Sequence, residues 1–206
     1  MRPRPLGLAR LAVFGPHVAG LVVTGLVVTG LLVNGLLVTG CGGAAAPSPP
    51  TNWPLPADAG AAARAAGLPM LGQEMLDVHY HAHLDVIVRG QKITVPAYVG
   101  IDAGRKTITA LHTHDTSGIV HIESAADIPF TLGQFFNEWG QRLTVAEAGP
   151  VAATSDEEVR VYRNGKLVAG DPTAVKFEAH DEIVVWLGLK SENPKVPAGF
   201  TFPNGL

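Results

Sequence analysis

Six of the eight histidines in this chain lie between His79 and His121, and their spacing is that of ligands on a β-sheet. In a β-strand every second side chain points to the same face, so alternating histidines can converge on one side of a sheet. Imidazole is the commonest metal ligand and also titrates near neutral pH. The histidines form two sets, His79, His81 and His83 in the first, and His112, His114 and His121 in the second.

The second set is the expected primary metal site, because two ligands from one strand and one from its neighbour are typical of His₃ sites on β-sheets, with a fourth position open. The first set is expected to form an accessory or second site. The chain has one cysteine, so nitrogen and oxygen atoms must hold the metal, and such ligands favour copper or zinc. Four residues are expected to orient the imidazole rings by hydrogen bonds: Asp85, Asp115, Glu123 and Tyr98.

The first set must be carried by a strand with one apolar face and one histidine face. A turn at residues 90–91 is expected to continue this strand into a hairpin, since glycine favours the first position of a type II′ turn. In that register Val88 pairs with Ile93, and Tyr98 lies opposite His83. The apolar face is formed by Val78, Tyr80, Ala82, Leu84, Val86 and Val88.

The second set is expected on a second hairpin, from Ile108 to Glu123, that turns at residues 115–118. In this hairpin His112 faces His121 across the two strands, and His114 lies on the same side, one step nearer the turn. Both hairpins therefore separate an apolar face from a histidine face.

The remaining pattern predicts an α+β fold of β-hairpins packed on one short helix. Thr131 and Gln134 form a capping box at the start of this helix, and Gly140 suits its end. Asn164-Gly165 predicts a type I′ hairpin over Val159 to Val168, and a last strand runs from Glu182 to Leu187. The helix is expected to contribute four side chains to the hydrophobic core: Leu132, Phe135, Phe136 and Trp139.

Hairpins, one helix and further strands resemble the β-grasp plan. The segments Val159-Arg-Val-Tyr-Arg-Asn-Gly-Lys166 and Phe177-Glu-Ala-His-Asp-Glu-Ile-Val-Val185 look like its closing strands. The stretch Leu111-His-Thr-His-Asp-Thr-Ser-Gly-Ile-Val-His-Ile-Glu123 is similar to uncharacterised bacterial membrane-associated proteins. These resemblances imply a fold, not an activity.

The N-terminal segment has the pattern of an export signal. Three arginines precede an uncharged apolar stretch, residues 11–40, which contains a five-residue tandem repeat and runs into Val38-Thr-Gly-Cys41. This resembles the lipobox of bacterial lipoproteins, which implies cleavage before Cys41, lipidation of its sulfur, and anchoring to the cell membrane outside the cytoplasm. The stretch also exceeds the roughly 20 residues that span a bilayer, so an uncleaved transmembrane anchor is the alternative.

The expected organisation is a lipoprotein signal peptide over residues 1–40, a lipid-anchored flexible linker over 41–74, the His-rich domain over 75–190 and a C-terminal tail over 191–206. The linker is Pro-rich, with a short helix expected over Ala59 to Ala66. All 18 acidic residues follow the signal peptide, whereas three of the 15 basic ones lie within it, so nucleic acid is not an expected partner.

Three functions are consistent with these patterns. The first is a cell-surface metal-binding lipoprotein that captures, buffers or transfers copper or zinc, with an unidentified protein partner outside the cytoplasm. The second is a metalloenzyme with a His₃ site and an open coordination position. The third is a pH-responsive or protein-interaction module without metal. The sequence lacks His-Glu-x-x-His and Gly-x-Ser-x-Gly motifs, and its surplus of histidines favours binding or transfer over catalysis.

Overall fold

The structure is a computed structural model that describes residues 48–206. The expected signal peptide, the lipidation site at Cys41 and the alternative membrane anchor lie outside the described residues. Within residues 48–206, neither helix combines the length and the apolar character that a membrane span requires.

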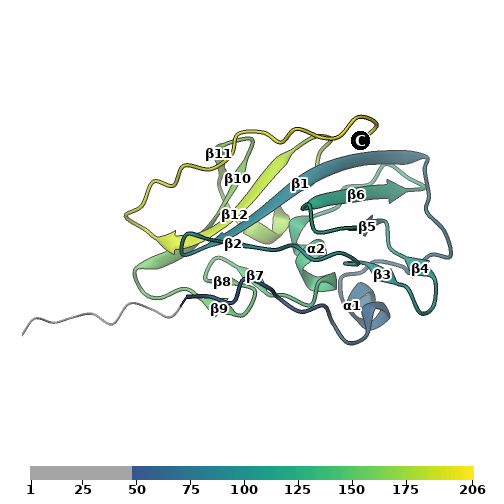
Figure 1. Ribbon diagram of the computed structural model, residues 1–206, viewed down its shortest axis with the longest axis horizontal. Helices are drawn as coiled ribbons and strands as arrows, with labels where there is room; N and C mark the ends of the chain where they lie inside the picture. The colour runs from purple at the N-terminus through teal and green to yellow at the C-terminus, as the bar shows by residue number, and fades with distance from the viewer. Residues whose placement is uncertain (1–47) are drawn as a thin grey trace, which may run out of the picture. The chain divides into compact units, whose positions relative to one another are not determined.

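The described residues form a mixed α+β fold in which strands predominate, as the sequence predicts (Figure 1). The helical elements are α1 (Ala59–Ala65), α2 (Leu132–Glu138) and the 3-10 helix η1 (Pro172–Ala174). The strands are β1 (Val78–Val88), β2 (Gln91–Ile93), β3 (Ile101–Asp102), β4 (Thr107–Ile108), β5 (Leu111–His112), β6 (Ile119–Ser124), β7 (Leu143–Thr144), β8 (Glu147–Ala148), β9 (Val151–Ala152), β10 (Glu157–Arg163), β11 (Lys166–Val168) and β12 (Glu182–Leu189).

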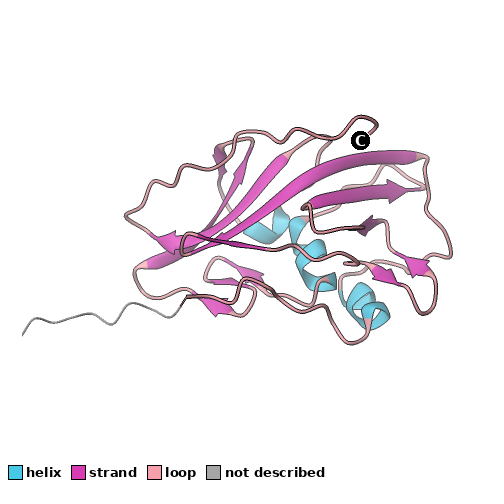
Figure 2. Cartoon of the chain, in the orientation of Figure 1, coloured by secondary structure: helices cyan, strands magenta, loops and turns pink. Residues whose placement is uncertain are grey.

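The main sheet is a seven-stranded, curled sheet with the order β11-β10-β12-β1-β6-β5, in which β2 also pairs with β1. The long strand β1 is parallel to β12 on one edge and antiparallel to β6 on the other. Both helices lie on one face of this sheet (Figure 2). We call the opposite face the outer face.

The alternation in β1 places its apolar side chains in the core and its histidines on the outer face. Ala82, Leu84, Val86 and Val88 are each at most 1% exposed and belong to one hydrophobic cluster. Burial of a side chain such as leucine or valine stabilises the fold by about 1.5–3 kcal/mol, so this alternation fixes which face is buried.

Helix α2 supplies the other half of this core and begins and ends as predicted. The Thr131 side chain accepts a hydrogen bond from the Gln134 backbone, and the Gln134 side chain accepts one from the Thr131 backbone. Gly140 follows the helix with a φ of 73°. The predicted core side chains of α2 are all buried: Leu132, Phe135, Phe136 and Trp139.

Two of the predicted hairpins are confirmed in register. In the β5–β6 hairpin His112 pairs with His121, with Leu111 opposite Ile122. In the β10–β11 hairpin the turn residues Asn164 and Gly165 both have positive φ, as a type I′ turn requires.

The hairpin that follows β1 differs from the prediction. Its turn is Arg89-Gly90, whose φ values of 51° and 76° make it a type I′ turn, so Val86 rather than Val88 pairs with Ile93. Strand β2 ends at Ile93, because β6 occupies the same edge of β1 beyond this point. The prediction that Tyr98 lies opposite His83 is therefore wrong.

The segment expected to be a flexible linker contributes to the core over its described part. Trp53 is 1% exposed, and its ring centroid lies 5.4 Å from that of Trp139 on α2. Helix α1 forms where it was predicted, with the Asp58 side chain accepting from the Ala61 backbone as its N-cap. The linker prediction followed from the proline content of this segment and did not consider Trp53. Burial of this large aromatic side chain outweighs the entropic cost of ordering the chain around it.

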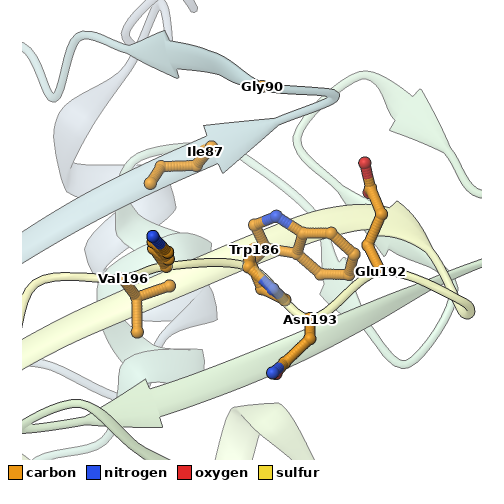
Figure 3. A pocket seen from close by; sticks show the side chains of 8 residues that line it. Ile87, Gly90, Trp186, Glu192, Asn193 and Val196 are labelled. Carbon is orange, nitrogen blue, oxygen red and sulfur yellow. The ribbon is translucent and has the colours of Figure 1, made fainter.

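The C-terminal tail, residues 191–206, is ordered against the outer face of the sheet (Figure 1). Val196 packs on a small cluster that includes Trp186, and the Phe200 ring stacks on His83 with 3.8 Å between centroids. A hollow of about 380 Å³ lies between Trp186 and residues 192–196 (Figure 3). The tail thus covers the outer face from Trp186 as far as His83 and His180.

We predict that Trp53→Ala lowers the free energy of unfolding by about 3–5 kcal/mol, since it leaves a large cavity against Trp139. Leu55→Ala, in the same segment but at a position 38% exposed, should cost less than about 1 kcal/mol. Urea denaturation of both variants measures the difference. Equal costs would show that this segment is a tether and not part of the core.

Candidate metal centre

The register of three neighbouring strands brings the two sets of histidines together. In the antiparallel pairing of β1 with β6, His81 lies opposite His121 and His79 lies opposite Glu123. The pairing of β6 with β5 places His112 on the other side of His121. His81, His121 and His112 therefore form one row across β1, β6 and β5 on the outer face, where these strands lie side by side (Figure 1).

Five imidazoles lie in this row or beside it. The distances between their nitrogen atoms fit either hydrogen bonds between the rings or ligands of a shared metal ion. His81 Nε2 lies 3.2 Å from His79 Nε2 and 3.0 Å from His121 Nδ1. On the far side His112 Nε2 lies 3.2 Å from His114 Nε2. The accessory set is thus not separate from the primary one, because His79 and His81 adjoin it directly.

Glu123 lies among these rings, with one carboxylate oxygen near three imidazole nitrogens and hydrogen-bonded to none of them. Its Oε1 atom is 3.4 Å from His79 Nε2, 3.5 Å from His121 Nδ1 and 3.8 Å from His112 Nε2. We call these five histidines and Glu123 the metal cluster. Its ligand atoms form two overlapping groups of four that share His121 and Glu123, each group with its atoms within 4.8 Å of one another.

The cluster is buried in its middle and open at two ends. His112 is fully buried, and His81 and Glu123 are only 3% and 4% exposed. The side chains of His79 and His114 are 40% and 45% exposed. The cluster is therefore accessible to solvent at both ends.

Burial keeps the inner imidazoles uncharged. It lowers the pKa of His112 to about 4, and burial together with the neighbouring His81 lowers the pKa of His121 to about 3. Burial and the proximity of His79 also lower the pKa of His81. Neutral imidazole is the form that ligates metals.

The carboxylate of Glu123 has no charge partner among the described lysines and arginines. Burial raises its pKa, and the nearby Glu74 adds to this effect. Its Oε2 atom is buried and accepts no hydrogen bond from the described residues. A buried carboxylate oxygen without a partner costs free energy, which a bound cation would offset.

His112 is held by its second nitrogen, as metal-binding histidines usually are. Its Nδ1 donates to the backbone carbonyl of Thr109 at 2.9 Å, which leaves Nε2 with a free lone pair toward the cluster. The Thr109 hydroxyl lies 2.9 Å from Glu138 Oε2 and 2.8 Å from the Leu111 carbonyl. Glu138 on α2 thus supports, through Thr109, the loop that orients His112.

His83 is the one predicted ligand that the structure separates from the cluster. Its Nδ1 is 2.6 Å from Glu182 Oε2, and its Nε2 is 3.0 Å from the Ser117 carbonyl. With Asp85 and Glu182 it forms another group that could hold a metal, but both of its nitrogens already face acceptors. Since a ligand nitrogen needs a free lone pair, this arrangement suits a doubly hydrogen-bonded histidine better than a metal ligand.

Three of the four residues predicted to orient the rings do not do so. Asp85 pairs with Lys92 at 2.7 Å, and Asp115 accepts from the Ser117 backbone within its own turn. Tyr98 is 54% exposed, because β2 ends before the pairing that would have brought it to the histidines. Only Glu123 lies at the cluster, and it lies in the ligand group itself.

Sequence reasoning missed Glu74, Thr109 and Glu138. Glu74 Oε1 lies 3.8 Å from His114 Nε2, and it precedes β1 in a segment without periodicity. For Glu138 the sequence contained one signal, a carboxylate flanked by the apolar stripe of α2.

Comparison of the chain with protein-family models, curated proteins and solved structures gave no match, so the interpretation of the cluster depends on its own geometry.

We predict that Glu138→Gln removes a pH dependence of stability. Glu138 is 1% exposed, and its burial raises its pKa well above the ordinary value. The folded protein then keeps a proton that the unfolded chain releases above about pH 4.5, so stability falls as pH rises, by at most about 1.4 kcal/mol per pH unit. The glutamine side chain of the variant cannot ionise, so the variant loses this slope.

Urea denaturation of the metal-free protein at several pH values measures the effect. Glu147→Gln is the matched control, because Glu147 is more exposed than Glu138 and forms an ion pair with Arg142. If Glu138→Gln and the unmutated protein show the same pH slope, Glu138 is ionised in the folded state.

Proposed function

We propose that this protein is a cell-surface metal-binding lipoprotein that captures, buffers or transfers copper or zinc through the metal cluster. The observation that carries the proposal is the buried carboxylate of Glu123, which lies beside the uncharged imidazoles of His112 and His121 and has no lysine or arginine partner among the described residues. A transition-metal ion would supply the missing charge and use the imidazole lone pairs. Nitrogen-rich sites of this type suit Cu²⁺ and Zn²⁺.

Binding and transfer explain the cluster better than catalysis does. Its two exposed histidines, His79 and His114, open it to solvent, which suits the uptake and release of an ion. An enzyme also needs a cavity for its substrate beside the metal. The pockets of about 380 Å³ are lined by other residues than those of the cluster.

The alternative to a metal ion in the cluster is a proton that neighbouring imidazoles share. The distances of 3.0 and 3.2 Å between imidazole nitrogens are also those of N–H···N hydrogen bonds. One protonated imidazole would neutralise Glu123 and give the pH-responsive module. The lowered pKa values of His112 and His121 argue for the metal, because they disfavour the imidazolium near neutral pH.

The lipid anchor and the β-grasp relationship belong to the same proposal. The lipobox-like Val38-Thr-Gly-Cys41 supports lipidation and a place outside the cytoplasm. The parallel pairing of the first long strand, β1, with the last strand, β12, supports a β-grasp-like arrangement. Outside the cytoplasm, a protein partner would deliver or accept the metal.

We predict that the full-length chain, purified in detergent, retains Cu²⁺ or Zn²⁺ and unfolds at a higher temperature with it. At a free metal concentration 100 times the dissociation constant, binding stabilises the fold by about 2.7 kcal/mol. His121→Ala combined with Glu123→Gln should abolish retention, since both residues belong to both ligand groups. Metal analysis and thermal unfolding give the two readouts.

His180→Asn is the matched control for this experiment. It removes a histidine outside the cluster, and asparagine tolerates the positive φ of 59° at this position. The variant should retain as much metal as the unmutated protein. Absence of both retention and thermal stabilisation in the unmutated protein would leave the pH-responsive module as the better explanation.

We further predict that Cys41→Ser stops incorporation of labelled fatty acid, because lipidation requires the thiol. Labelling of cells that express each form measures the incorporation. Absence of the label from the unmutated protein would favour the uncleaved transmembrane anchor.

A further inference from the structure

The metal cluster offers more ligands than a four-coordinate ion can use. Its ligand atoms come from His79, His81, His112, His114, His121 and Glu123. A tetrahedral Zn²⁺ site takes four such atoms, and two ligands of one ion are at most about 4.2 Å apart with metal–nitrogen bonds of about 2.1 Å. The atoms instead fall into two groups of four, one with His79 and His81, and the other with His112 and His114.

The first group has nearly the dimensions of a tetrahedral site. Ligands at about 2.0–2.1 Å from a metal lie about 3.3–3.4 Å from one another in a tetrahedron. The distances between His79, His81 and His121 along this group are 3.2 and 3.0 Å. Glu123 Oε1 closes the group at 3.4 and 3.5 Å. Small shifts of these side chains are enough for an ion to enter.

The second group is built around His112. Its Nε2 is 3.2 Å from His114 Nε2 and 3.8 Å from Glu123 Oε1, and its ring is held by the Thr109 carbonyl. Glu74 lies 3.8 Å from His114 and brings a second carboxylate to this side alone. The second group therefore has its own acidic residue and its own exposed histidine, independent of the first.

Resting on the proposed function, we propose that the cluster binds two transition-metal ions side by side, which share Glu123, while His121, whose neutral ring has one lone pair, ligates one of them. A carboxylate has two oxygens and can contact both ions of a two-metal site, in which the ions are about 3.5–4 Å apart. Oε1 of Glu123 faces the histidines, and its buried Oε2 has no partner among the described residues. His79 and His114 give the two ions separate routes to solvent.

The test is a titration of the metal-free, full-length chain in detergent with Zn²⁺ and with Cu²⁺, followed by equilibrium dialysis and metal analysis. The unmutated protein should bind two equivalents. His79→Ala with His81→Ala should bind one, and so should His112→Ala with His114→Ala. His180→Asn, outside the cluster, should still bind two.

Two further measurements separate a lost site from a lost fold. In the Cu²⁺ titration, the electron paramagnetic resonance signal per copper should fall as the second equivalent enters, because two neighbouring Cu²⁺ ions couple; each double variant should keep an uncoupled signal. Glu74→Gln, a surface change, should weaken one of the two binding steps and leave the other unchanged.

The outcomes distinguish this inference from the proposed function. One equivalent in the unmutated protein, lost in both double variants, would overturn the two-ion site and leave the metal-binding function intact. Two equivalents with uncoupled copper signals would also overturn it, since the ions would then bind apart. No bound metal at all would overturn the proposed function itself.

Discussion

The antiparallel pairing of β1 with β6 is the constraint on which the site depends. It places His81 opposite His121 and His79 opposite Glu123, so the first hairpin's histidines adjoin those of the second. A slip of one residue would turn the histidines of β1 into the core and its apolar side chains outward. The hydrophobic burial of Ala82 and Leu84 in the same core as α2 therefore positions the candidate ligands, although neither residue belongs to the metal cluster.

The burial of Glu123 and of the imidazoles beside it has a desolvation cost that lowers the stability of the fold. Glu123 and three imidazoles are taken out of water on the outer face, where desolvation raises the pKa of the acid and lowers the pKa of His112 and His121. Such groups destabilise a protein unless they are paired. The main sheet can hold them because β1 is fixed on both edges, by β12 and by β6, and because its other face is buried.

Local patterns were enough where a single element decides the outcome. The pleat of β1, the capping box of Thr131 and Gln134, the Asn164-Gly165 turn and the pairing of His112 with His121 all depend on neighbours in sequence, and all were predicted. Predictions failed at the turn after β1, which Arg89 and Gly90 form in place of residues 90–91, and where a distant segment competed. β6 pairs with the edge of β1 along which β2 was expected to extend, so Tyr98 does not lie opposite His83. Trp53 packs against Trp139, so the Pro-rich segment is part of the core and not a flexible linker.

By itself, the sequence determined which residues could be ligands and which face of each strand they occupy, because alternation is a local property of the extended chain. The tertiary structure alone decided which of them meet. Strand order placed β6 between β1 and β5, which joined His79 and His81 to the second set and made Glu123 a member of the cluster. It also left His83 to Glu182 of β12, because the two edges of β1 face different partners. Pairing between strands far apart in sequence is fixed by burial of the whole core, which no local pattern encodes.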